Sequence, residues 1–167
     1  MKILVTGLPD SGKTSILNEM ELVEVKTVNP VVGFNVEMVN YQTITFVVLE
    51  LNNKQHTELW ESFLPDTDGV IFVVDSNDRE RCEEAGKELH RIMNIEKLQD
   101  VVLLVLANKK DLQNAMNGEE TAAKLHTSDL KVKKWRIQRT CATTGEGLHE
   151  AVDWFTDELR RRLKLHV

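Results

Sequence analysis

Short apolar runs alternate along this chain with amphipathic helical patterns. Strands are expected where apolar residues run together, at Ile3–Val5, Phe34–Asn40, Ile44–Leu51, Val70–Val74, Val101–Ala107 and Trp135–Gln138. Helical spacing covers Lys13 to about Leu22, Asp78–Ile95, a segment from Gly118, and Glu146 to about Leu163. This alternation predicts an α/β fold, with a mostly parallel sheet and helices on both of its faces.

Two local signals refine this pattern. Few residues separate the second and third strands, so we expect a hairpin near Asn40–Gln42. Asp78 stands at the start of a helical pattern and is a candidate cap. Ligands of such folds bind beyond the carboxyl ends of the strands. The loops at 7–13, 50–53, 108–111 and 141–143 are therefore expected around one site.

Length and charge narrow the function. The chain has 167 residues, which suits one domain over 1–167. Its formal net charge of -6 argues against a general nucleic-acid binder. No apolar run approaches the roughly 18 residues of a membrane-spanning helix, and the first residues run directly into a Gly-rich motif. We expect a cytoplasmic protein in which Cys82 and Cys141 are free thiols.

The segment Gly7–Thr14 reads GLPDSGKT and fits G-x-x-x-x-G-K-[ST] between a strand and a helix. We call it the phosphate loop. Glycines let backbone N–H groups face an anion, and a helix N-terminus adds positive potential. Lys13 is expected to reach the terminal phosphates and the Thr14 hydroxyl to bind Mg²⁺. The predicted nucleotide contacts here are Gly7, Asp10, Ser11, Gly12, Lys13, Thr14 and Ser15.

The segment Asn108–Asp111 reads NKKD and follows the buried run Val101–Ala107. We call it the base loop. Asp111 can accept hydrogen bonds from N1–H and the 2-amino group of guanine. Adenine lacks both donors, so against adenine a buried carboxylate would be left unpaired. With a phosphate loop about a hundred residues earlier, Asn108, Lys109 and Asp111 predict guanine recognition.

With these motifs in place, the chain resembles the ADP-ribosylation factor family along essentially its full length. The matching stretches are Gly33–Glu37, Val73–Arg81, Leu106–Lys109, Asn114–Asn117 and Cys141–Leu148. The resemblance implies a phosphate-loop small GTPase fold with a six-stranded sheet, five helices and a GTP/GDP site with Mg²⁺. It also implies nucleotide contacts from Cys141, Ala142 and Thr143, with the Ala142 N–H facing the base. Switch segments are implied near 27–37 and 50–62.

Both switch segments depart from the family pattern. Val31 stands where the family has the Thr that completes the Mg²⁺ shell with GTP bound, and Val cannot ligate. Glu50 occupies the position of the Mg²⁺-associated Asp, so it is a candidate ligand through water. Lys54 falls at the water-positioning Gln, and Gln55 could replace that catalytic group only if the loop shifts. Lys13 remains to stabilise charge in phosphoryl transfer.

The resemblance also implies protein effectors or regulators, bound through three exposed aromatics. Phe34 and Phe63 match two of them, whereas Leu49 replaces the family's Trp. Lys2 stands where myristoylation requires Gly, so the usual membrane anchor is unsupported. We expect a monomer that binds no nucleic acid. The family's setting in vesicle trafficking and signalling would place it in the cytoplasm or at the Golgi and other endomembranes.

These observations favour a guanine-nucleotide-binding protein with impaired hydrolysis and weakened switching. One alternative is a conventional switch GTPase completed by a partner, by Gln55 or by Glu50. A second is a pseudo-GTPase scaffold that binds little nucleotide, against which the intact base loop and Lys13 argue. A phosphate-loop kinase would need a lid and an acceptor site, and neither is visible in this sequence.

Overall fold

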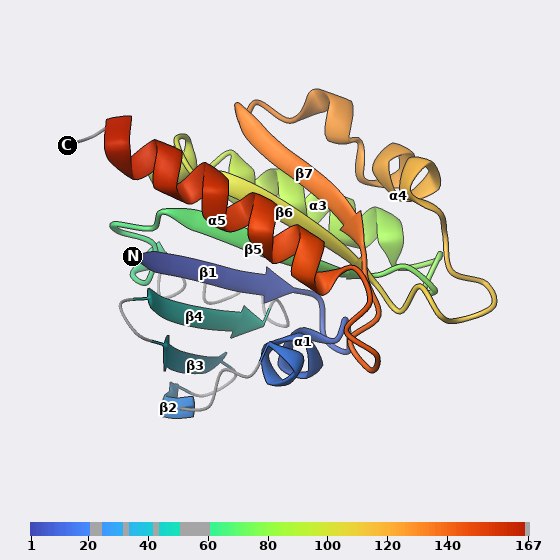
Figure 1. Cartoon of the computed structure of the whole chain (residues 1–167), viewed down its shortest axis with the longest axis horizontal. Coiled ribbons are helices and arrows are strands. Elements are labelled where there is room, and N and C mark those ends of the chain that lie inside the picture. The colour runs from blue at the N-terminus through green and yellow to red at the C-terminus, as the bar shows by residue number, and fades with distance from the viewer. Residues whose placement is uncertain (21–24, 32–33, 42–43, 51–60, 166–167) are drawn as a thin grey trace.

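Strands and helices alternate to build one sheet with helices on both faces (Figure 1). The computed structural model describes residues 1–20, 25–31, 34–41, 44–50 and 61–165. The sheet has seven strands in the order β2-β3-β4-β1-β5-β6-β7. Strands β4, β1, β5, β6 and β7 run parallel. Strands β2 and β3 add an antiparallel edge.

The elements have the following bounds. The strands are β1 Lys2–Gly7, β2 Val25–Val31, β3 Phe34–Tyr41, β4 Ile44–Glu50, β5 Gly69–Asp75, β6 Val102–Asn108 and β7 Lys134–Arg139. The α-helices of the described residues are α1 Lys13–Glu19, α3 Cys82–Met93, α4 Gly118–Leu125 and α5 Leu148–Leu165. Two short 3₁₀ turns, η2 Glu96–Leu98 and η3 Thr127–Asp129, follow α3 and α4.

The core lies in two layers, one on each face of the sheet. Successive strand side chains point to opposite faces, so Leu4 and Phe72 pack with α3 and α4. Ile3 and Ile71 pack with α1 and α5. Both faces of β1, β5 and β6 are buried, which explains their unbroken apolar runs. Figure 1 shows α5 crossing one face of the sheet while α3 lies behind it.

The predicted α/β fold and the hairpin pairing of β3 with β4 are confirmed, but the element count is corrected. The sheet has seven strands instead of six because Val25–Val31 pairs with β3. That segment was expected within a switch, yet it is rich in β-branched residues, which suit a strand. Its pairing is irregular between Val28 and Val31, around Pro30, which has no N–H to donate. The described residues hold four α-helices, where the resemblance implied five.

Several helix limits also differ from the expectation. Helix α3 begins at Cys82 with Arg81 at its N-cap position, so Asp78 is not the helix cap. Its carboxylate instead accepts the Arg81 N–H at 3.2 Å and closes the turn that precedes the helix. Helix α1 ends at Glu19 and α5 begins at Leu148. None of the helices described is both long and apolar enough to cross a bilayer.

Candidate functional site

The carboxyl ends of the central strands bring together three of the four predicted loops, and residues 51–53 of the fourth lie outside the described residues. Strand β1 ends at Gly7, and β5 ends at Asp75 directly beside Asn108 of β6. Ala107 pairs with Arg139 at the end of β7, which leads into Thr140–Thr143. The phosphate loop, the base loop and the segment after β7 therefore share one edge of the sheet, as their positions in the sequence predicted.

The phosphate loop is held tightly against the base loop. Gly12 has a φ of 101°, a left-handed value that side chains rarely adopt. A Cβ at Gly12 would lie 2.2 Å from the Asn108 Nδ2 atom. Only glycine leaves room for this approach, which explains its place in the motif.

The Lys13 side chain folds back so that its ammonium hydrogen-bonds with atoms of the phosphate loop. The Nζ atom donates to the Leu8 carbonyl at 2.8 Å, to the Gly7 carbonyl at 3.2 Å and to the Ser11 hydroxyl at 3.4 Å. The residue is only 6% exposed, although it carries a charge. A buried ammonium held by carbonyl dipoles is well placed to meet an incoming anion.

A pocket of about 350 Å³ opens above this loop. We call it the phosphate pocket, and its lining consists of Asp10, Gly12, Lys13, Thr14, Ser15 and Lys109. Thr14 and Ser15 are exposed in the first turn of α1 and line this pocket. Six of the predicted contacts therefore line one cavity.

The donor set fits Mg²⁺ bound together with phosphate. No cluster of three His, Cys, Asp or Glu residues able to hold a metal occurs among the described residues. Thr14 offers a hard hydroxyl oxygen at the wall of the phosphate pocket. Mg²⁺ is commonly held by one or two protein ligands together with substrate phosphates and water. The pocket chemistry thus suits a metal that arrives with a polyphosphate.

Asn108 connects three segments through its buried amide. Its Nδ2 atom donates to the Ser11 carbonyl at 3.1 Å. Its Oδ1 atom accepts from the Ala142 N–H and from the Thr140 hydroxyl, both at 3.2 Å. The side chain therefore fixes the phosphate loop, the base loop and the segment after β7 relative to one another. The Ala142 N–H, which the resemblance assigned to the base, is donated to Asn108 in this structure.

Lys109 makes a second link between the loops. Its Nζ atom donates to the Asp10 carbonyl at 2.7 Å and pairs with the Asp75 carboxylate at 2.8 Å. Lys109 and Asp10 both have a φ of 63°, uncommon for residues other than glycine. Two strained backbones joined by one hydrogen bond indicate a site held in a defined shape by its surroundings.

Asp111 is exposed just beyond β6. Next to it, the buried Cys141 thiol contacts the Thr143 hydroxyl at 3.0 Å. Hydrogen bonds from the side chains of Thr143 and Thr144 lower the pKa of the Cys141 thiol. By contrast, burial raises the pKa of the Cys82 thiol in α3. Both cysteines are free, as expected.

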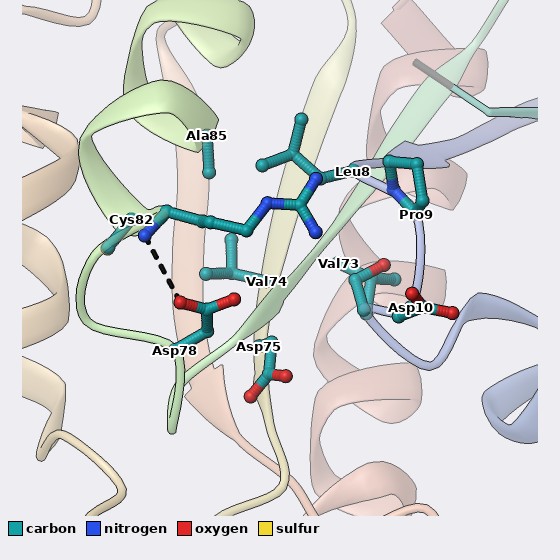
Figure 2. Close-up of a pocket in the computed structure, with 11 residues that line it drawn as sticks. Leu8, Pro9, Asp10, Val73, Val74, Asp75, Asp78, Cys82 and Ala85 are labelled. Carbon is teal, nitrogen blue, oxygen red and sulfur yellow. Dashed lines mark hydrogen bonds between the residues drawn. The ribbon is translucent and has the colours of Figure 1, made fainter. Parts of the chain in front are cut away.

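A second, smaller pocket of about 30 Å³ lies between the phosphate loop and α3. Figure 2 shows Leu8, Pro9 and Asp10 on one side of it, and Ala85 and Cys82 of α3 on the other. This space is about large enough for one water molecule. Asp10 lines both this pocket and the phosphate pocket.

The predicted effector surface is only partly described. Leu49 was expected there in place of an aromatic, but it is 0% exposed and packs in the core layer with Val47 and Leu4. Phe63 is half-buried against the same layer. The Phe34, Val31 and Glu50 side chains lie outside the described residues, although their backbones belong to strands, and Gln55 lies outside them entirely.

Two residues of the site were not singled out from the sequence. Asp75 pairs with Lys109, and its Oδ1 atom also accepts the Asn77 N–H at 2.9 Å. Thr140 is fully buried beneath Asn108. Asp75 carried a usable signal, because it is a carboxylate at the end of the apolar run Val70–Val74. Thr140 carried no comparable signal of its own.

Most of the chain matches one known protein family. The model of the ADP-ribosylation factor family matches residues 1–159. The match covers every strand of the sheet and each of the loops that meet at the phosphate pocket.

Proposed function

Because the chain belongs to the ADP-ribosylation factor family of GTP-binding small GTPases, we propose that it binds GTP or GDP with Mg²⁺ but hydrolyses GTP slowly and switches weakly. The supporting observation is the Asn108 amide, which holds the phosphate loop and the base loop in one assembly. Residues 1–167 would act as one small GTPase domain.

In this proposal the nucleotide phosphates enter the phosphate pocket. Lys13 turns its ammonium from the loop carbonyls toward the terminal phosphates, and the Thr14 hydroxyl coordinates the metal. Bound Mg²⁺ would neutralise part of the phosphate charge. Glu50 would contribute through water, since its backbone ends β4 beside Gly7.

The base would be read by Asp111, with Lys109 lying along the ring. Lys109 is suited to this task because Asp75 and the Asp10 carbonyl fix its ammonium. Cys141, Ala142 and Thr143 close the pocket behind Asn108. The specificity for guanine would follow from two donors on the base that a carboxylate can accept.

Slow hydrolysis follows from the residues at the two switches. Val31 has no oxygen to bind the metal, and Lys54 cannot orient water as an amide does. The protein then supplies charge stabilisation from Lys13 without positioning the attacking water. A partner that brings a glutamine or an arginine could restore a faster reaction.

Partners and location follow the same reasoning. Phe34 and Phe63 would form part of a surface for protein effectors or regulators. We propose a monomer that works in the cytoplasm or at endomembranes and makes no contact with nucleic acid, since its net charge is -6.

Guanine specificity can be tested by exchanging the base-reading carboxylate. Asp111→Asn replaces one acceptor by a donor, which pairs with the 2-oxo group of xanthine and not with the 2-amino group of guanine. Titration with fluorescent GDP and XDP should show at least about a 100-fold shift toward XDP, since unpaired polar groups in a site discriminate strongly.

The matched control is Asp129→Asn, an exposed carboxylate in η3 away from the site. It should leave the preference for GDP unchanged. Failure of the unaltered protein to bind any guanine nucleotide would contradict the proposal and favour an interaction scaffold.

A further inference from the structure

The phosphate loop carries an unusual acidic residue in a constrained position. Asp10 has a left-handed backbone with a φ of 63°, and its carbonyl accepts the Lys109 ammonium at 2.7 Å. Asp10 is exposed and lines the phosphate pocket together with Lys13 and Lys109. Because its backbone is tied to the base loop, Asp10 is held at the wall of the cavity.

The charges around this pocket nearly cancel. Among the described residues, the charged side chains that line it are Lys13, Lys109 and Asp10. The Lys109 ammonium is already paired with the Asp75 carboxylate at 2.8 Å. When Asp75 is counted with the lining, the described side chains at the pocket supply two ammonium groups and two carboxylates, and thus no net positive charge to favour a highly charged ligand.

The repulsion between the Asp10 carboxylate and a bound nucleotide increases with the number of phosphates. A terminal γ-phosphoryl group adds roughly one negative charge at neutral pH. Charges within about a Debye length of 8 Å interact with little screening by physiological salt. A carboxylate on the wall of the pocket therefore weakens the binding of GTP more than the binding of GDP.

We propose that Asp10 is a specificity-determining residue that makes this chain bind GDP in preference to GTP. The inference rests on the proposed function, because it assumes that phosphates occupy the pocket lined by Lys13 and Asp10. It differs from loss of the switch contacts, since its cause is a charge in the phosphate loop itself. The chain would dwell in its diphosphate state even where hydrolysis is slow.

The test compares Asp10→Asn with the unaltered protein. Asparagine keeps the size of the side chain and tolerates the left-handed backbone, so the variant removes charge alone. Dissociation constants for GDP and GTP are measured with Mg²⁺ by displacement of a fluorescent GDP. The unaltered protein should bind GDP at least about tenfold tighter than GTP, and Asp10→Asn should reduce that ratio about tenfold.

Asp66→Asn is the matched control. Asp66 is also exposed with a φ of 63°, but it lies before β5 at the opposite end of the parallel strands. This variant removes the same charge from the same backbone conformation and should leave the ratio within twofold. Should Asp10→Asn fail to fold, Asp10→Gly removes the charge and relieves the backbone as well.

The outcomes separate this proposal from the proposed function. Equal binding of GTP and GDP by the unaltered protein overturns the role of Asp10, as does a ratio that Asp10→Asn leaves unchanged. Raising the salt concentration should lower the ratio of the unaltered protein toward that of the variant. Absence of binding to either nucleotide would contradict the proposed function instead.

Discussion

At the scale of single residues, the Asn108 amide joins three segments of the site through its hydrogen bonds. It is 1% exposed and serves the Ser11 carbonyl, the Ala142 N–H and the Thr140 hydroxyl. Asn108→Ala leaves these groups buried without that partner. We expect the free energy of unfolding in urea to fall by about 3 kcal/mol, with a matching loss of affinity for GDP.

The control for this prediction is Asn114→Ala on the exposed segment that follows the base loop. Its effect should stay within about 0.5 kcal/mol. If both alanine variants unfold at the same urea concentration, the Asn108 amide does not hold the loops together.

Binding residues could be predicted from the sequence where they lie in one continuous segment. The phosphate loop and the base loop were recognisable because their residues are adjacent in the sequence. Asp75 was visible as a carboxylate after an apolar run, but its pairing with Lys109 depends on the register that sets it beside Asn108, and no spacing in the chain encodes that register. Leu49 was placed on the effector surface only because it stands where the family has an aromatic, but it packs in the core layer with Leu4 and Val47.

At the scale of elements, α5 is fastened to the sheet near its C-terminal end. Arg162 donates from Nε to the Asp100 carbonyl at 2.8 Å and from Nη1 to the Asp68 carboxylate at 2.6 Å. Asp68 also accepts the Lys2 N–H at 2.9 Å. Through Asp68 and Asp100, the Arg162 side chain therefore links α5 to the starts of β1, β5 and β6. The exposures of the Arg162 and Asp68 side chains are 21% and 17%.

Arg162→Ala should therefore lower the free energy of unfolding by about 2 kcal/mol, because a partly buried, charge-assisted bond is lost. Arg160→Ala is the matched change on the same helix. Its partner Asp157 is 3.8 Å away and both side chains are more than half exposed, so its effect should be under 0.5 kcal/mol. Equal losses in urea denaturation would refute the role of Arg162.

Element types and the β3–β4 hairpin were predictable from the sequence pattern, whereas strand β2 at the edge of the sheet was not. Buried strands such as β5 and β6 are unbroken apolar runs, which lie between two helical layers. Strand β2 contains Lys26, Asn29 and Pro30, which weaken any strand signal. This strand forms by pairing with β3, and the sequence of β2 alone does not indicate that pairing.

At the scale of the whole molecule, the sheet is a platform, and three loops of the site follow the carboxyl ends of its parallel strands. Two apolar layers on its faces fix β1, β5 and β6, and the ends of these strands set the positions of the loops. None of these three loops contains a residue of the altered switch segments near 27–37 and 50–62. Nucleotide binding should therefore survive even though hydrolysis is impaired.

The most direct test of this account is single-turnover hydrolysis. The protein is stripped of nucleotide, loaded with GTP and Mg²⁺, and the bound nucleotide is separated by ion exchange over time. The account predicts that GTP is taken up close to one per chain and cleaved more slowly than about 10⁻⁴ s⁻¹, below the intrinsic rate of a GTPase with complete machinery. Rapid cleavage without any partner, or no uptake of GTP at any concentration, would contradict it.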